Sequence, residues 1–304
     1  MNDPSRSDLE PSVTRYRIAH RTEYRYSAPV AMCQNQLRMT PSLTDRTRVL
    51  QNAIHITPSP DTVREHDDYF GNHVVTFAIE AVHRSLLVES DSEIELLSAT
   101  TAIEPSPTWL EAARELQQPV EPHALYAAEY ALPSPQIQWH EDVKQYASES
   151  FHSEPSLVPA AIELTRRIYR DFKYDTKATN VSTTVDEVFQ LRAGVCQDFA
   201  QFQIACFRSI GLAARYVSGY LRTLPPPGKA KLVGADESHA WCSVYLGKSL
   251  GWLDLDPTNG CKVAMDHIPI CVGRDYLDVS PMRGLAIGGG TPALNVSVDV
   301  SLLE

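Results

Sequence analysis

The segment from Tyr16 to Tyr26 alternates between two kinds of side chain along its whole length. Its sequence, YRIAHRTEYRY, places tyrosine, isoleucine, histidine and threonine at the even positions and mostly arginine or glutamate at the odd ones. A period of two matches a β-strand, in which successive side chains point to opposite faces, and does not match a helix. The pattern therefore predicts a half-buried strand, and a fold that begins with a sheet.

Further strand candidates follow at residues 48–57, 62–68, 73–80 and 84–96. They are separated by residues typical of turns, such as Pro58-Ser-Pro60 and the segment DYFGN at 68–72. Residues 1–98 are therefore expected to form a β-rich, sandwich-like N-terminal domain.

The composition changes between residues 99 and 155. Seven prolines interrupt this segment, alternating with short helical patterns such as TWLEAARELQQ at 108–118. Because proline breaks a helix, we interpret residues 99–155 as a helical, proline-rich connector.

Residues 156–304 are expected to form a second domain that begins with helices. Apolar side chains recur at helical spacing in residues 161–172, and residues 184–187 have the form of an N-terminal capping box. The run CQDFAQFQIACFRSI at 196–210 predicts a longer helix, which Gly211 would end. Strand patterns then follow at 215–221, 238–246 and 251–256, and the C-terminal segment is assigned to the same domain as a strand. Helices followed by an antiparallel sheet indicate an α+β fold.

The charge balance argues against one class of function. The 304 residues carry a formal net charge of -11, with a sequence pI near 5.4, and no stretch gathers lysine and arginine. Nucleic acids need clustered positive side chains, so we expect no nucleic-acid partner. The first residues lack the basic-then-apolar order of a secretory signal, and no run approaches the roughly 18 apolar residues of a membrane span. We therefore expect a cytoplasmic protein with no membrane partner.

Six cysteines are present, at positions 33, 196, 206, 242, 261 and 271. In a chain of this size without an export signal they are expected to be free thiols. None of their spacings is C-x-x-C, so we expect no structural zinc site, and no segment has the pattern of a calcium loop. The sequence thus predicts neither a metal nor another cofactor.

Cys196 is the candidate nucleophile. It lies where a helix is expected to begin, directly after Ala193-Gly194-Val195. The N–H groups of a helix N-terminus favour the thiolate, which is the attacking form of a cysteine. The glycine would let the backbone turn tightly into the helix, and the Cys196 N–H could donate to an oxyanion. On these grounds alone, a cysteine at a helix start is more often a packing residue.

A catalytic cysteine also needs a histidine, and a group that orients the imidazole. His239 lies in a strand pattern that places Trp241 on the same face. The sequence LGKSLG at 246–251 predicts a hairpin turn to the next strand. With an even loop, Asp254 and Asp256 both share the face of His239, and Asp256 is diagonal to it. Strand parity does not separate the two aspartates.

Four successive segments resemble motifs of the bacterial transglutaminase-like proteins, a family to which cysteine-protease activity is ascribed. They are GVCQDFA at 194–200, ARYVSGY at 214–220, SHAW at 238–241, and GW followed by DPTNG at 251–260. The segments YRIAHRTEYRYSAPV, QLRMTP and DYFGN resemble the β-rich N-terminal region of that family, and so does GRDYLDV, with glycines 288–290, near the end. The resemblance spans most of the chain and implies a papain-like or transglutaminase-like domain, with helices packed on an antiparallel sheet. It implies no metal.

The resemblance assigns the nucleophile to Cys196, the histidine to His239 and the orienting aspartate to Asp256. It thereby selects Asp256 over the neighbouring carboxylate at position 254. One departure concerns the nucleophile's neighbours, which are Gln and Trp in animal transglutaminases but Val195 and Gln197 here. A second oxyanion donor must then come from elsewhere. Tyr174 is a candidate, with a core tyrosine as the alternative.

These residues predict a thiol-dependent acyl transfer on a peptide or protein substrate, through a thioester. Water as acceptor would make a cysteine protease or amidase, and an amine would make a protein-glutamine amine transferase, that is, a transglutaminase. We favour hydrolysis because water needs no second specific pocket. A non-catalytic interaction module on the same fold and a cysteine-rich metal-binding protein are the alternatives from other classes. The loop at 222–237 is expected to shape or cover the cleft, and the sequence leaves the oligomeric state open.

Overall fold

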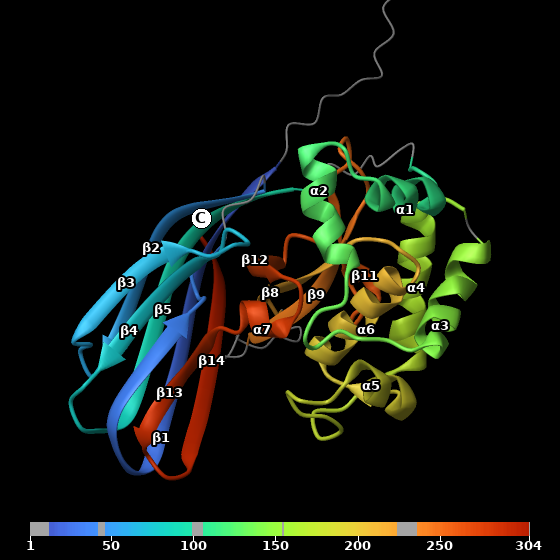
Figure 1. Ribbon diagram of the computed structural model, residues 1–304. Helices are drawn as coiled ribbons and strands as arrows, with labels where there is room; N and C mark the ends of the chain where they lie inside the picture. Colours follow the sequence, from blue (N-terminus) through green and yellow to red (C-terminus); the bar gives the residue numbers. More distant parts are fainter. Residues whose placement is uncertain (1–11, 42–45, 99–105, 154, 224–235, 304) are drawn as a thin grey trace, which may run out of the picture.

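The computed structural model describes residues 12–41, 46–98, 106–153, 155–223 and 236–303. The first sheet lies on one side of the molecule and most helices lie on the other, with a second sheet between them (Figure 1). Helices and antiparallel strands thus occupy different parts of the molecule, and the α+β class predicted from the sequence is confirmed.

The N-terminal domain is built on one very long strand. β1 covers Val13–Leu37, and its alternating burial agrees with the alternation in the sequence. Its first half pairs with β5 and β14, whereas its second half pairs with β4 and β13. The register shifts between Arg25 and Val30, where the strand passes from one layer to the other. The result is a sandwich-like sheet in which both layers share β1. The other strands are β2 (Thr47–Thr57), β3 (Thr62–Asp67), β4 (His73–Ile79), β5 (His83–Leu97), β13 (Met282–Gly288) and β14 (Pro292–Leu303).

The C-terminal strands β13 and β14 differ in placement from the sequence-based expectation. The sequence assigned them to the second domain, but the strand ladders that they form within the described residues are to β1, and a single bridge joins Val298 to Asp236. The physical reason is that one long edge of β1 would otherwise expose unpaired backbone groups. Residues 288–290 all have positive φ, so the glycine run forms the turn that was predicted there.

The second domain begins inside the segment that the sequence analysis treated as a connector. α3 covers Glu141–Ser153 and packs on α4 (Leu157–Asp171) and α6 (Cys196–Ser209), so it belongs to the main core. The capping box predicted at the start of α5 (Val185–Leu191) is present, with Thr184 and Glu187 bonding each other's backbone N–H groups. The remaining helices are α1 (Trp109–Gln117), α2 (Pro122–Ala128), η1 (Glu129–Ala131) and α7 (Tyr276–Val279). No described helix is both long and apolar enough to span a membrane.

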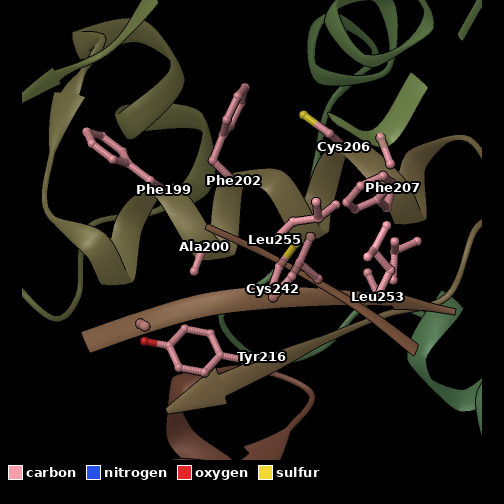
Figure 2. Packing of buried hydrophobic residues seen from close by; sticks show 14 of the residues in the cluster. Phe199, Ala200, Phe202, Cys206, Phe207, Tyr216, Cys242, Leu253 and Leu255 are labelled. Atoms are coloured by element: carbon pink, nitrogen blue, oxygen red, sulfur yellow. The ribbon is translucent and has the colours of Figure 1, made fainter. Parts of the chain in front are cut away.

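The second sheet is antiparallel, in the order β11-β10-β9-β8-β12. Its strands are β8 (Ala214–Leu221), β9 (Glu237–Tyr245), β10 (Trp252–Asp256), β11 (Cys261–Lys262) and β12 (His267–Gly273), and the two-residue strands β6 (Lys173–Tyr174) and β7 (Ala193–Gly194) pair separately. α6 lies against β9 and is buried on all sides between residues 198 and 208. In Figure 2, Ala200 of α6 points toward the sheet that carries Cys242, Leu253 and Leu255. Phe199 and Phe202 point away from the sheet, and they pack on Phe172 and Phe189. Because α6 is enclosed by this core, its N-terminus is held in a fixed position.

The two domains share one hydrophobic core. Tyr16 and Ile18 of β1 belong to the same buried cluster as the phenylalanines of α6. Further along β1, Val30 and Leu37 belong to a separate cluster enclosed by the sandwich. The first half of β1 therefore packs at the interface between the domains, and its second half packs in the core of the sandwich.

A hairpin turn of the N-terminal domain forms hydrogen bonds across this interface. The DYFGN turn lies between β3 and β4, and its Asn72 side chain is fully buried. The amide Nδ2 of Asn72 donates to the Val272 carbonyl at 2.8 Å, and its Oδ1 accepts from the Val272 N–H at 2.8 Å. Phe70 of the same turn packs on Tyr130 and Arg274. The turn thus joins the first sheet to β12.

We expect Asn72→Ala to lower the free energy of unfolding by about 2 kcal/mol, because it leaves the N–H and C=O of Val272 without their partners in a dry site. Urea unfolding followed by circular dichroism measures the change. Asn295→Ala is the control, since Asn295 is exposed on β14, and a surface change of this kind stays within about 0.5 kcal/mol. Equal effects of the two substitutions would contradict the assigned role of Asn72.

Candidate active site

Cys196 is the first residue of α6, as the sequence predicted. The side chain of Asp198 folds back over the helix start, where its Oδ2 accepts from the Val195 N–H at 2.8 Å and from the Thr179 hydroxyl at 2.6 Å. Asp198 is therefore used in holding the helix N-terminus. A Cβ at Gly194 would lie 2.6 Å from that carboxylate oxygen. The glycine is needed for this close approach, and its φ lies outside the positive range that favours glycine.

His239 and Asp256 come together across β9 and β10. Asp254 pairs with Ser243, which places Asp256 diagonally to His239, as the even hairpin loop predicted. The Nε2 of His239 lies 2.8 Å from Oδ2 of Asp256. Of the two aspartates that parity left open, the one that contacts the histidine is Asp256.

Five donors converge on the Asp256 carboxylate. Oδ1 accepts the backbone N–H groups of Thr258 at 2.8 Å and Asn259 at 3.2 Å. Oδ2 accepts the Asn259 side-chain amide at 2.7 Å, together with two imidazole groups. The turn in the DPTNG motif folds back on its own aspartate and supplies three of the five donors. A fully buried carboxylate surrounded by donors is held in its ionised form.

The second imidazole belongs to His267, which the sequence analysis did not single out. Its Nε2 lies 2.9 Å from Oδ2 of Asp256, and its Nδ1 accepts from the Ala264 N–H at 3.4 Å. The acceptor role of Nδ1 places the proton of a neutral His267 on Nε2, facing Asp256. The only sequence signal is a lone histidine beside the apolar run IPICV, one of ten histidines in the chain.

The contact between His267 and Asp256 depends on a strong curl of the second sheet. β12 and β10 are separated in the sheet by β8 and β9. In a flat sheet, strands spaced by roughly 4.8 Å would leave them about 14 Å apart, too far for a single hydrogen bond between these side chains. Trp241 of β9 packs edge-on against His267, with ring centroids 5.5 Å apart. Gly219 of β8 makes room, since a Cβ there would lie 2.4 Å from the Trp241 ring.

The charges of His239 and Asp256 stabilise each other. Burial disfavours the imidazolium of His239, but hydrogen bonds to Asp256 and to the Cys196 side chain outweigh it and raise the pKa of His239 to about 10. Burial also disfavours the Asp256 carboxylate, yet hydrogen bonds from His239, His267 and Asn259 outweigh it and lower the pKa of Asp256 well below its usual value. His239 is therefore an imidazolium at neutral pH, paired with a carboxylate at Nε2. Its Nδ1 is the nitrogen left for the thiol.

Cys196 and His239 line a cavity of about 330 Å³ between the two domains. Tyr216 also lines it, and burial, with a smaller effect of Cys196, raises the pKa of Tyr216 far above its usual value. Tyr174, the residue proposed from the sequence as an oxyanion donor, is about half exposed on β6 and is not among the residues that line this cavity. The part of the 222–237 loop from 224 to 235 lies outside the described residues.

The ligand atoms of His239, Asp256 and His267 lie within 4.8 Å of one another, which is a spacing that a metal ion can use. Each histidine, however, already uses its Nε2 toward Asp256. A metal at this position would displace both N–H groups and remove the contact that orients His239. The donor set therefore fits a hydrogen-bonded network better than a metal centre.

All six cysteines are free, as predicted, and those at 33, 206, 242 and 271 are buried.

Comparison with known proteins shows the family to which this chain belongs. Residues 16–95 match the bacterial transglutaminase-like N-terminal region, and residues 144–257 match the transglutaminase-like superfamily. The protein Rv2569c of Mycobacterium tuberculosis is 40% identical over 301 residues, which cover 95% of this chain and 93% of that protein. The chain belongs to the transglutaminase-like superfamily. A protein-glutamine gamma-glutamyltransferase of Pseudomonas aeruginosa is 36% identical over 153 residues, covering 47% of this chain but 22% of that enzyme.

The whole architecture of this transglutaminase-like protein occurs in a solved structure. A Cytophaga hutchinsonii protein, provisionally assigned as a cysteine protease, superposes with a TM-score of 0.75 over 96% of this chain and 92% of that one. The sequence identity is 19%, so the likeness is one of fold. The N-terminal sheet and the helical domain thus occur together in both proteins.

We expect His267→Phe to make the protein less stable to acid. Asp256 has a depressed pKa, so its contribution to stability is present above the ordinary carboxyl pKa and is lost as the pH falls through the folded-state value. Removing one charged hydrogen bond costs about 1.5–3 kcal/mol at neutral pH and moves acid unfolding to higher pH. Acid titration followed by circular dichroism measures the midpoint. His55→Phe, at an exposed position of β2, is the control, and the same midpoint in both variants would contradict the role given to His267.

Proposed function

We propose that this protein catalyses thiol-dependent acyl transfer on peptide or carboxamide substrates, with Cys196, His239 and Asp256 as its catalytic triad. The observation that carries the proposal is the arrangement of three side chains at the site. A cysteine at a helix N-terminus faces a histidine whose other nitrogen is 2.8 Å from a buried, ionised aspartate. This is the arrangement that activates a thiol for nucleophilic attack.

In the proposed mechanism the Cys196 thiolate attacks the substrate carbonyl, and a tetrahedral oxyanion forms. His239 gives its Nδ1 proton to the leaving amine as the C–N bond breaks, which leaves a thioester on Cys196. Asp256 keeps the ring in place through Nε2 and stabilises its positive charge. A water molecule then loses a proton to His239 and attacks the thioester, which releases a carboxylic acid and restores the thiolate. With water as the acceptor, the activity is that of a cysteine protease or amidase.

Transfer to an amine is the second candidate activity. The observation in its favour is the similarity to the Pseudomonas aeruginosa protein-glutamine gamma-glutamyltransferase, which is 36% identical over 153 residues. The first half of the reaction would be identical, and an amine would replace water in the second half. Incubation of a glutamine-containing peptide with and without a primary amine, followed by mass spectrometry, distinguishes a deamidated or cleaved product from an amine adduct.

The first test concerns the thiol itself. An ordinary thiol with a pKa near 8.5 is only about 1% ionised at pH 6.5. We expect iodoacetamide to label Cys196 at pH 6.5 more than about tenfold faster than Cys261, and His239→Ala to remove most of this difference. Mass-spectrometric mapping of the labelled peptides gives both rates in one experiment, and Cys261 is the internal control because it is partly exposed like Cys196, whereas the other four cysteines are buried.

The same experiment addresses the non-catalytic alternative. An interaction module that keeps only the fold has no need of an activated thiolate. Labelling of Cys196 at the rate of an ordinary thiol, unchanged in His239→Ala, would falsify the proposed triad. His55→Ala is the matched control for the loss of a histidine elsewhere.

Tyr216 is the side chain that we propose as a donor to the oxyanion, together with the Cys196 N–H. Its hydroxyl remains protonated because burial raises its pKa, and it lines the same cavity as the thiol. We expect Tyr216→Phe to slow acylation by p-nitrophenyl acetate on the order of 100-fold, the usual effect of removing one oxyanion donor. Alkylation by iodoacetamide forms no oxyanion, so its rate should stay the same. Tyr174→Phe is the control, and a comparable loss there would contradict this assignment.

A further inference from the structure

The cavity beside Cys196 has two walls that come from different domains. Cys196, Tyr216 and His239 line one side. β1 and β14 of the N-terminal sheet line the other, through residues that include Leu294 and Val296. The nucleophile therefore faces the N-terminal sheet across the cavity, and any acyl donor that reaches it must contact both domains.

The described lining of this cavity contains no lysine, arginine, aspartate or glutamate among its sixteen residues. These four residue types make up 21% of the chain, so a random set of this size would hold about three of them. His20 in the same lining is uncharged at neutral pH, because burial lowers its pKa to about 4. Among the described residues, the positive charge of the cavity is the His239 imidazolium, which is already paired with Asp256.

The wall formed by β14 is apolar and open. Leu294 and Val296 are 56% and 45% exposed, although Val298 and Val300 on the same face of the strand are fully buried against the second domain. The strand thus changes from a packed interface to an open surface at the point where it passes the cavity. Met282 at the start of β13 and Tyr24 of β1 continue this apolar surface.

We infer that the N-terminal sheet forms the acyl-donor subsite of this protein, and that the subsite takes a large, uncharged, apolar side chain next to the carbonyl that Cys196 attacks. The inference rests on the proposed acyl transfer and adds the class of substrate to it. A leucine or phenylalanine side chain of the donor packs on Leu294 and Val296. A carboxylate or an ammonium group in the same place loses its hydration and meets no opposite charge on the described walls, so it is disfavoured.

The experiment uses four small acyl donors that differ in one side chain: the p-nitrophenyl esters of N-acetyl phenylalanine, leucine, aspartate and lysine. The release of nitrophenolate reports acylation of Cys196, and Cys196→Ala supplies the background rate for each ester. We expect acylation with phenylalanine and leucine to be at least about tenfold faster than with aspartate and lysine, which is the usual range for one apolar contact in a pocket.

A charge placed on the β14 wall should reverse this preference. We expect Leu294→Arg to slow acylation by the phenylalanine ester about tenfold or more and to raise the relative rate of the aspartate ester. Leu285→Arg is the matched control, because Leu285 is 57% exposed on the neighbouring strand β13 and is not among the residues that line the cavity. It should keep the wild-type preference.

Iodoacetamide labelling of Cys196 distinguishes a failure of the proposed function from a failure of the proposed subsite. Slow labelling together with no acylation by any ester overturns the proposed function. Fast labelling with equal acylation by all four esters, or with the same profile in Leu294→Arg and Leu285→Arg, overturns the subsite while the proposed triad stands.

Discussion

Five hydrogen bonds hold the Asp256 carboxylate ionised at the end of β10, and the geometry around it depends on that charge. A carboxylate buried without donors would take up a proton and lose its hold on His239. The donors come from three separate places: the turn that follows β10, His239 on β9, and His267 on β12. The curled sheet brings these places together. The fold of the second domain therefore keeps the negative charge of Asp256 stable in a buried position.

The position of the thiol is set by a different part of the same core. α6 is enclosed by the other helices and the sheet, so the orientation of its N-terminus follows from packing and not from its own sequence. Asp198 and Thr179 then tie down the helix start, with Gly194 leaving room for the carboxylate. The charge network on the sheet and the packed helix are thus independent supports for the two halves of the site. Residues far from Cys196 can disturb either of them.

The structural features that could be predicted from the sequence depend mostly on local patterns. The alternation after Tyr16, the capping box at Thr184 and the helix that begins at Cys196 depend on neighbours within a few residues, and each was found where predicted. A hairpin of even length fixes the parity of its strands, so it was also accessible that Asp254 and Asp256 share the face of His239, and the family resemblance then selected Asp256. His267 was not, since its contact depends on how far the sheet curls, and no local pattern records curvature. The return of β14 to β1 escaped prediction for a similar reason, as it joins residues nearly 280 positions apart in the chain.

The return of β14 also bears on why the two domains remain together. The strand closes the sandwich along one edge of β1, and through Leu294 and Val296 it lines the cavity opposite Cys196. Without the N-terminal sheet, that side of the cavity would open to water, and the thiolate proposed at Cys196 would lose an apolar wall that limits its hydration. Substitutions at Leu294 or Val296 leave the hydrogen bonds of Asp256 and the packing of α6 untouched, because neither residue belongs to the cluster around α6 or bonds Asp256. The architecture therefore separates the residues proposed for chemistry from those proposed for choosing the substrate, and it allows the second group to change while the first is retained.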